Sequence, residues 1–109
     1  MASHITDGEG KIYSAGIWTV KPGKEEAFLR RWKEFAVWTD EHQEGVVGVV
    51  MVQDSEKPGV FISFGPWADL ESIRQWRQTP AFEAAFRDFK DLCEKIEPHT
   101  MKGVFSLTK

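Results

Sequence analysis

The chain has 109 residues, with 14 basic and 17 acidic side chains, and a formal net charge of −3. This length indicates one domain, and 41% hydrophobic with 28% charged residues is typical of a folded chain rather than a disordered one. The acidic balance argues against nucleic acid or an anionic membrane as a partner, and no stretch approaches the roughly 20 apolar residues of a membrane span. Cys93 is the only cysteine, which excludes an internal disulfide and predicts a cytoplasmic location.

The first half of the chain predicts a leader, a strand, a long helix and a second strand. Polar residues and glycines indicate a flexible leader, followed by one domain. β-Branched residues predict the strands, and apolar residues in steps of three and four predict the helix. The predicted segments are the leader at 1–10, the domain at 11–109, a strand at Ile12–Val20, a helix at about 24–43 and a strand at 46–53.

The second half predicts a hairpin, two helices and a last strand. Asp69 is a suitable N-cap for a short helix, and Thr79 followed by Pro80 suits the start of another. An apolar stripe that includes Phe86 and Cys93 extends this last helix until Pro98 ends it. The predicted segments are a loop at 54–59, a strand at Val60–Trp67, a helix at Leu70–Gln78, a helix from 79 to 98 and a strand at Met101–Leu107.

The order of these elements is that of the ferredoxin-like split βαβ arrangement, an α+β fold. Its four-stranded antiparallel sheet carries helices on one face only. In the third strand, Ile62 and Phe64 point away from Phe61 and Trp67, so both faces of the sheet carry large apolar groups. We therefore predict a homodimer in which two sheets pack into an α+β barrel.

Aromatic residues gather at the end of the third strand and on the helices that follow it. On the helix-facing side of the sheet, Gly16 and Ser63 are small and leave space. One interpretation is an apolar cleft for a small apolar or aromatic molecule. The other is a core in which aromatic side chains fill the space. The residues that would wall the cleft are Trp18, Trp67, Trp76 and Phe86.

Two histidines are candidates for proton transfer. His42 lies one step beyond Thr39 on the long helix, and His99 follows Pro98. Either ring could act as a general base. We favour the alternatives, a helix-end histidine and a solvent-facing one. No pair of histidines or cysteines has metal-ligand spacing and no dinucleotide-binding motif is present, so we expect neither a metal site nor a cofactor.

Several segments match a known family. They are V-K-P-G-K-E-E-A-F at Val20–Phe28, the glycine Gly45 before the second strand, Trp67 at the end of the third, Trp76, and T-P-A-F at Thr79–Phe82. With these segments, residues 12–107 resemble the antibiotic biosynthesis monooxygenase domain of the dimeric α+β barrel superfamily. The superfamily also contains heme-degrading enzymes, so the resemblance implies the fold more specifically than the activity.

The resemblance implies roles for particular positions. Trp67 matches a tryptophan used by the heme-degrading branch, whereas Gly16 stands at its asparagine position and Phe86 at its iron-ligating histidine. Phenylalanine has no lone pair for iron, which argues against heme degradation. The family's quinone-forming monooxygenases also use the tryptophan, with an asparagine where this chain has Ser63.

Two hypotheses follow. The first is a cofactor-independent monooxygenase for a small aromatic or polycyclic substrate. In it Trp67 stacks on the substrate, and Ser63 or a histidine such as His42 binds or deprotonates a phenolic oxygen. The remaining predicted substrate contacts are Gly16, Trp18, Trp76, Phe86 and His99. The alternative is a non-enzymatic dimeric domain that binds a small ligand.

Overall fold

The computed structural model describes residues 4–6 and 11–108 of the chain. Its helices and strands follow one another in the order β-β-α-β-β-α-α-β-β. The strands are β1 His4–Thr6, β2 Ile12–Val20, β3 Val50–Gln53, β4 Val60–Trp67, β5 Cys93–Lys102 and β6 Ser106–Thr108. The helices are α1 Glu25–His42, α2 Leu70–Arg77 and α3 Pro80–Leu92. No helix in the described ranges is both long and apolar enough to cross a bilayer.

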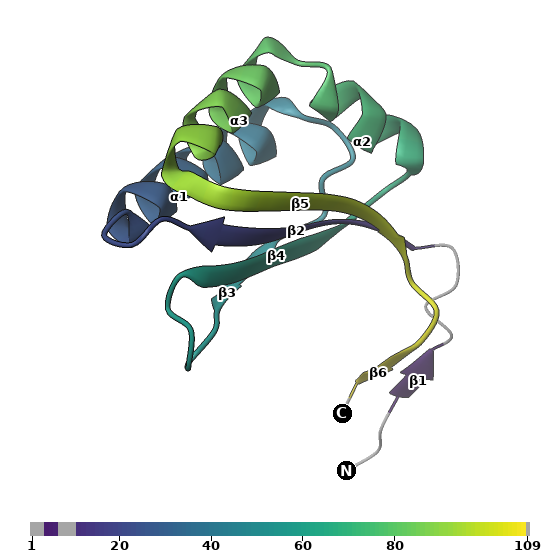
Figure 1. The fold of residues 1–109 in the computed structure, drawn as a ribbon. Helices are drawn as coiled ribbons and strands as arrows, with labels where there is room; N and C mark the ends of the chain where they lie inside the picture. The colour runs from purple at the N-terminus through teal and green to yellow at the C-terminus, as the bar shows by residue number, and fades with distance from the viewer. Residues whose placement is uncertain (1–3, 7–10, 109) are drawn as a thin grey trace.

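Four strands form one antiparallel sheet in the order β3-β4-β2-β5. All three helices lie on the same side of this sheet (Figure 1), which confirms the predicted ferredoxin-like α+β fold. β1 and β6 pair with each other in a separate two-stranded ribbon that extends away from the helices (Figure 1). The predicted leader over residues 1–10 lies outside the described residues apart from β1.

The core lies between the helices and the sheet. Phe61 and Trp67 of β4 are buried on the helix-facing side, whereas Ile62 and Phe64 are exposed on the other, as the alternation of the strand predicts. Phe28 of α1 is fully buried, and its ring lies 5.2 Å from that of Phe61. The rest of the core is also largely aromatic and includes Trp18, Phe35 and Phe89.

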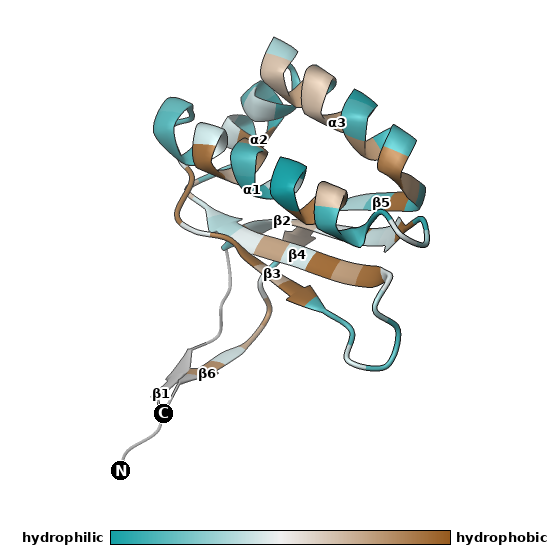
Figure 2. Cartoon of the chain, turned by 90° about the vertical axis from the view of Figure 1, so that its left-hand side faces the viewer, coloured by the Kyte–Doolittle hydropathy of each residue, from teal (hydrophilic) through white to brown (hydrophobic). Residues whose placement is uncertain are grey.

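The face of the sheet without helices is apolar. Val50 and Val52 of β3 and Ile62 and Phe64 of β4 are each between 40% and 47% exposed. They are directly paired across the strands, Val50 with Phe64 and Val52 with Ile62, so they form one continuous patch. Figure 2 shows the hydrophobic colouring along β3 and β4. We call these four residues the open sheet face.

The last helix ends earlier than predicted. α3 stops at Leu92, and residues 93–102 form β5, so the prediction of a helix reaching Pro98 is wrong. Lys21, in the turn after β2, donates its backbone N–H to the Leu92 carbonyl at 2.9 Å and its ammonium to the Asp91 carbonyl at 2.9 Å. These bonds satisfy carbonyls at the helix end. Pro98 is tolerated because β5 is an edge strand.

Cys93 is therefore the first residue of β5 rather than part of the helical stripe. It is buried, as predicted, and carries a free thiol. Burial raises the pKa of this thiol to about 11, so the group is protonated at neutral pH. A protonated, buried thiol is a weak nucleophile, which agrees with the prediction of an inert side chain.

The second predicted strand is shorter than expected. Only Val50–Gln53 forms a ladder, whereas Val46 makes an isolated bridge with Trp67. Between them the chain passes over the helix-facing side of Gly65, where a Cβ atom would overlap the Gly48 carbonyl. The strand prediction failed here because this close approach depends on a glycine in a different strand.

The turn and cap predictions are confirmed. The Asp69 carboxylate accepts the Ser72 N–H at 2.8 Å, and hydrogen bonds from the Ser72 side chain and backbone lower the pKa of Asp69. The Thr79 hydroxyl accepts the Phe82 N–H at 3.1 Å and starts α3. Gly45 has φ of 88°, the left-handed conformation expected after α1.

We predict that Gly65→Ala destabilises the fold by about 1–3 kcal/mol, because the added methyl group must displace the backbone at Gly48. Chemical denaturation would measure the change. Gly48→Ala is the matched control, since a Cβ there meets no atom within 4 Å. Equal stability of the two variants would contradict the close approach of these strands.

Candidate functional site

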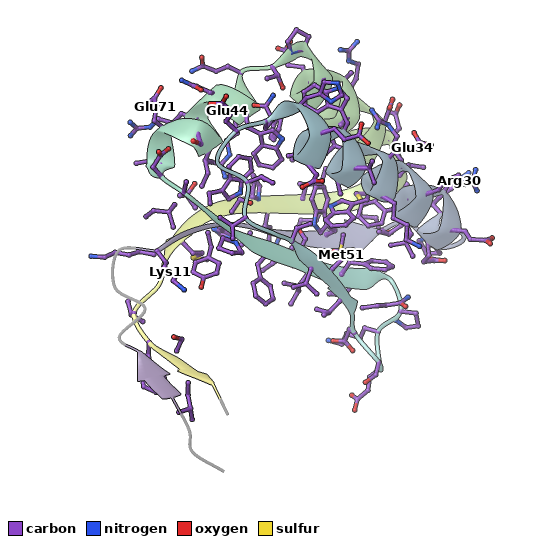
Figure 3. The ribbon with its side chains drawn as sticks, turned by 180° about the vertical axis from the view of Figure 1, so that it is seen from behind. Lys11, Arg30, Glu34, Glu44, Met51 and Glu71 are labelled. Carbon is purple, nitrogen blue, oxygen red and sulfur yellow. The ribbon has the colours of Figure 1, made fainter. Side chains whose placement is uncertain are left out.

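A cavity of about 330 Å³ lies between α1 and the sheet. We call it the α1 cavity. Its apolar wall comes from α1, the end of β4 and α2, and includes Trp32, Phe35, Trp67 and Trp76. Arg30 and Glu34 project from α1 away from the sheet, whereas Met51 of β3 lies beneath the helix (Figure 3). A cavity is therefore present beside Trp67 and Trp76, as the first interpretation expects, whereas the Trp18 indole fills the space over Gly16, as the second expects.

Three tryptophan indoles donate hydrogen bonds to hydroxyl groups of the α1 cavity. Each of these hydroxyl groups belongs to a residue that lines the cavity. An indole N–H can only donate, so its hydroxyl partner acts as acceptor and keeps its own O–H as a donor. The pairs are Trp18 with Ser63 at 3.0 Å, Trp67 with Ser14 at 2.9 Å and Trp76 with Thr39 at 3.0 Å.

The pair of Trp18 and Ser63 is the most deeply buried, with 4% and 7% of the two residues exposed. The two belong to neighbouring strands, in which Ser63 is directly opposite Gly16. A Cβ atom on Gly16 would lie 2.9 Å from the Trp18 Nε1 atom. Gly16 is therefore small because the indole of Trp18 folds over it on the way to Ser63.

Trp67 and Trp76 form a second layer of the wall. Their ring centroids are 4.9 Å apart. The Ser14 hydroxyl of β2 holds the Trp67 indole, and the Thr39 hydroxyl of α1 holds the Trp76 indole. Because the two acceptors come from the sheet and from the helix, these bonds fix both indoles relative to opposite sides of the cavity.

The loop between α1 and β3 closes one side of the cavity. Val46, Gly48 and Val49 line it. The Ala68 N–H donates to the Gly45 carbonyl at 2.7 Å, and the Val47 N–H donates to the Pro66 carbonyl at 3.1 Å. The departure of this segment from the sheet therefore adds a wall to the site.

Asp40 is the ionisable side chain among the residues that line the α1 cavity. It lies on α1 next to Thr39 and is exposed, so its carboxylate is at the rim. A carboxylate in this position can accept a proton from a ligand. Within the described ranges, no three His, Cys, Asp or Glu side chains gather into a group that could hold a metal ion.

Three of the predicted site residues come together in the α1 cavity: Ser63, Trp67 and Trp76. Gly16 and Trp18 are buried beside them and act through Ser63 rather than lining the cavity. Phe86 does not line it either. Its ring stacks on Phe82 at 4.2 Å, in a separate groove between α3 and β5.

The two predicted histidines lie elsewhere. His42 is exposed, stacks on Trp38 at 4.8 Å, and places its Nδ1 atom 2.9 Å from the Trp38 carbonyl. Because a carbonyl only accepts, Nδ1 carries the proton in this contact. His99 pairs with Ala15, so its side chain belongs to the sheet face opposite the helices. Neither ring faces the α1 cavity.

The prediction of the site omitted Ser14, Thr39 and Asp40. Ser14 lies on the same face of its strand as Gly16 and Trp18, so the alternation of side chains along the strand could have identified it. Thr39 is a polar residue on the buried stripe of α1, where it is 5% exposed. Asp40 has no comparable pattern, because its position at the rim follows from how α1 crosses the sheet.

The fold and the cavity define a small ferredoxin-like domain with an aromatic-lined cavity. The sequence profile of the family described as antibiotic biosynthesis monooxygenase matches residues 12–88. The match covers more than half of the chain, and the chain belongs to this family. No curated protein sequence matches it.

Solved structures share the fold at low sequence identity. A conserved protein from Methanosarcina mazei is 21% identical, with a TM-score of 0.77, over 88% of this chain and 95% of that one. A mutant of SnoaB, a cofactor-independent oxygenase from Streptomyces nogalater, is 18% identical, with a TM-score of 0.76, over 89% and 93% of the two chains. A protein from Shewanella oneidensis is 15% identical, with a TM-score of 0.77, over 99% and 100%.

We predict that Ser63→Ala lowers the free energy of unfolding by about 1–3 kcal/mol, because it leaves the buried Trp18 N–H without an acceptor. Ser14→Ala is the control. Its bond to Trp67 is only partly buried, so water can replace the hydroxyl and the loss is smaller. Urea denaturation of both variants would measure the difference, and a Ser63→Ala variant as stable as the parent would refute this role.

Proposed function

We propose that this protein is a cofactor-independent monooxygenase that oxidises a small aromatic substrate in the α1 cavity. The observation that carries the proposal is the combination of an aromatic wall, inward hydroxyl groups and one rim carboxylate in a single cavity. Membership of the antibiotic biosynthesis monooxygenase family supports it. The similarity of the fold to SnoaB, itself a cofactor-independent oxygenase, is consistent with it.

The cavity suits a hydroxyarene. Its volume of about 330 Å³ is near the lower end of small-molecule sites, which favours a substrate of roughly one or two fused rings. Trp67 and Trp76 offer ring faces for stacking. The Ser63 O–H, whose oxygen already accepts from Trp18, is the donor for the phenolic oxygen.

The reaction begins with proton transfer from the phenolic hydroxyl to Asp40. The resulting phenolate is electron-rich and reduces dioxygen directly. Recombination at a ring carbon gives a peroxide anion, which takes the proton back from Asp40 to become a hydroperoxide. This hydroperoxide loses water as a C–H bond and the O–O bond break. One oxygen atom remains as the new quinone carbonyl and the other leaves as water. The substrate supplies every electron that dioxygen takes up, so the balance needs no further reductant.

We predict that Asp40→Asn lowers kcat by about 10²–10⁴-fold, because the amide does not accept the phenolic proton. KM changes little, since the aromatic wall is intact. Oxygen uptake with a panel of naphthols and quinols would measure both constants. Glu41→Gln, an exposed neighbour on α1 that does not line the cavity, is the matched control and retains activity.

Two outcomes would count against this proposal. Equal activity of the Asp40→Asn and Glu41→Gln variants would exclude Asp40 as the base. Absence of oxygen uptake by the parent protein with every compound that quenches its tryptophan fluorescence would exclude the reaction.

A second candidate function is ligand binding without chemistry. The observation that favours it is the exposed position of Asp40, since the rest of the lining is apolar or hydroxylic. In this case the α1 cavity would store or carry the aromatic compound. If an aromatic compound binds and the concentration of dissolved oxygen does not fall, the protein is a binding protein rather than a monooxygenase.

We also propose that the chain acts as a homodimer in the cytoplasm, with the open sheet face as its interface. The four residues of this face are apolar and contiguous. Covering them removes apolar surface from water, which favours association. The buried, protonated thiol of Cys93 is compatible with a reducing compartment.

We predict sedimentation at twice the 12.5 kDa mass of the chain. Ile62→Glu places a charge in the open sheet face and shifts the protein towards the monomer. Gln75→Glu adds the same charge on the exposed side of α2 and leaves the dimer intact. A parent protein that sediments as a monomer at micromolar concentration would contradict the proposal.

A further inference from the structure

A second hollow, of about 670 Å³, lies between α3 and β5. We call it the α3–β5 groove. It shares no lining residue with the α1 cavity. Figure 1 shows α3 above β5, which is the edge strand of the sheet. The proposed oxygenase reaction uses none of its residues, so the groove needs its own explanation.

Arg77, the last residue of α2, extends into this groove. Its guanidinium donates to the Thr100 hydroxyl at 2.7 Å and to the His99 carbonyl at 3.1 Å. Both acceptors are neutral. The ion pairs among the described residues involve other side chains, Arg31 with Asp88 and Lys95 with Glu97. Arg77 is therefore a half-buried cation whose charge no carboxylate balances.

Burial lowers the pKa of Arg77, which reports the cost of removing its charge from water. A guanidinium has five N–H donors, and two hydrogen bonds leave several of them for a ligand. An anion beside Arg77 would balance the charge and accept these donors. A carboxylate matches the planar guanidinium best, because two parallel hydrogen bonds can form.

Other cations reinforce Arg77. Lys90 lines the groove, and Arg87 lines an adjoining hollow that also includes Arg77 and Lys90. Lys95, which is paired with Glu97, also lines the groove, and two acidic residues, Glu94 and Glu83, border this region, so the cations outnumber the acids. This local positive balance contrasts with the net charge of −3 of the whole chain. This local balance attracts a small anion to the groove.

Much of the remaining lining of the groove is apolar. Phe82 and Phe86 of α3 stack with their centroids 4.2 Å apart and are both half-buried. Ile96 and Pro98 of β5 add to this apolar surface. An inorganic anion would leave these side chains in contact with water, whereas a molecule with an aromatic body and an anionic group would contact both them and the cations.

We propose that the α3–β5 groove is a binding site for a small aromatic carboxylate. The carboxylate pairs with Arg77 and Lys90, and the ring lies against Phe82 and Phe86. The site is separate from the α1 cavity and does not depend on its proposed chemistry.

Titration with 1-naphthoate, followed by the backbone amide resonances of the protein, tests the proposal. We expect saturable shifts at Ile96 and Thr100. We expect affinity to fall about tenfold with neutral 1-naphthamide or in the Arg77→Gln variant, since both remove the charge-assisted pair. Arg74→Gln, which changes an exposed arginine on the same helix, is the control and binds like the parent.

Because Arg77 also joins α2 to β5, its replacement could disturb the fold. Lys90→Gln provides an independent variant, since Lys90 is exposed, and it weakens 1-naphthoate binding by about threefold or more. Absence of saturable shifts, equal affinity for the amide, or unchanged binding in both groove variants would overturn the proposal. Shifts confined to Trp67 and Trp76 would also overturn it, because they would assign the ligand to the α1 cavity.

Discussion

A buried indole N–H needs an acceptor, and this requirement organises the helix-facing side of the sheet. Trp18 meets it through Ser63, 45 positions away along the chain but on the neighbouring strand. The bond is possible only because Gly16 has no side chain beneath the indole. Three features of the sequence, a glycine, a serine and a tryptophan, therefore have one structural cause.

The same requirement shapes the α1 cavity. Trp67 and Trp76 are each held by a hydroxyl, one from the sheet and one from α1, so their rings form a fixed wall. Gly65 lets the segment around Gly48 pass over the sheet and close another side. The cavity thus depends on hydrogen bonds from the indoles to hydroxyl groups and on a close backbone contact at Gly65. One added methyl group at Gly16 or Gly65 would disturb this arrangement. Its aromatic wall and hydroxyl donors are the features that the proposed oxidation of a hydroxyarene uses.

Much of the fold could be predicted because the relevant signals are local. The strands Ile12–Val20 and Val60–Trp67 have the predicted bounds, since alternation and turn residues define them. The end of α3 could not be predicted, because Lys21 fixes it from a distant turn. Pro98 was misleading for a related reason. It looks like a helix terminator in sequence, and only the sheet order identifies its strand as an edge.

The site shows the same division between local and tertiary information. Strand parity was sufficient to group Ser63 and Trp67. Helical periodicity put His42 on the stripe of Thr39, but α1 ends there and the ring lies outside the cavity. Phe86 was assigned to the same cleft as Trp67, whereas α3 directs it into a separate groove. These errors concern how helices cross the sheet, which the pattern of a single helix does not encode.

We propose that the α1 cavity, with its indole wall, receives the aromatic ligand. The indole N–H resonances of the five tryptophans test it directly, recorded while 2-naphthol is added to the protein. We expect saturable shifts for Trp67 and Trp76, which line the cavity, and a stationary resonance for Trp38, which does not. Stationary Trp67 and Trp76 resonances at saturating 2-naphthol, or shifts confined to Trp38, would contradict it.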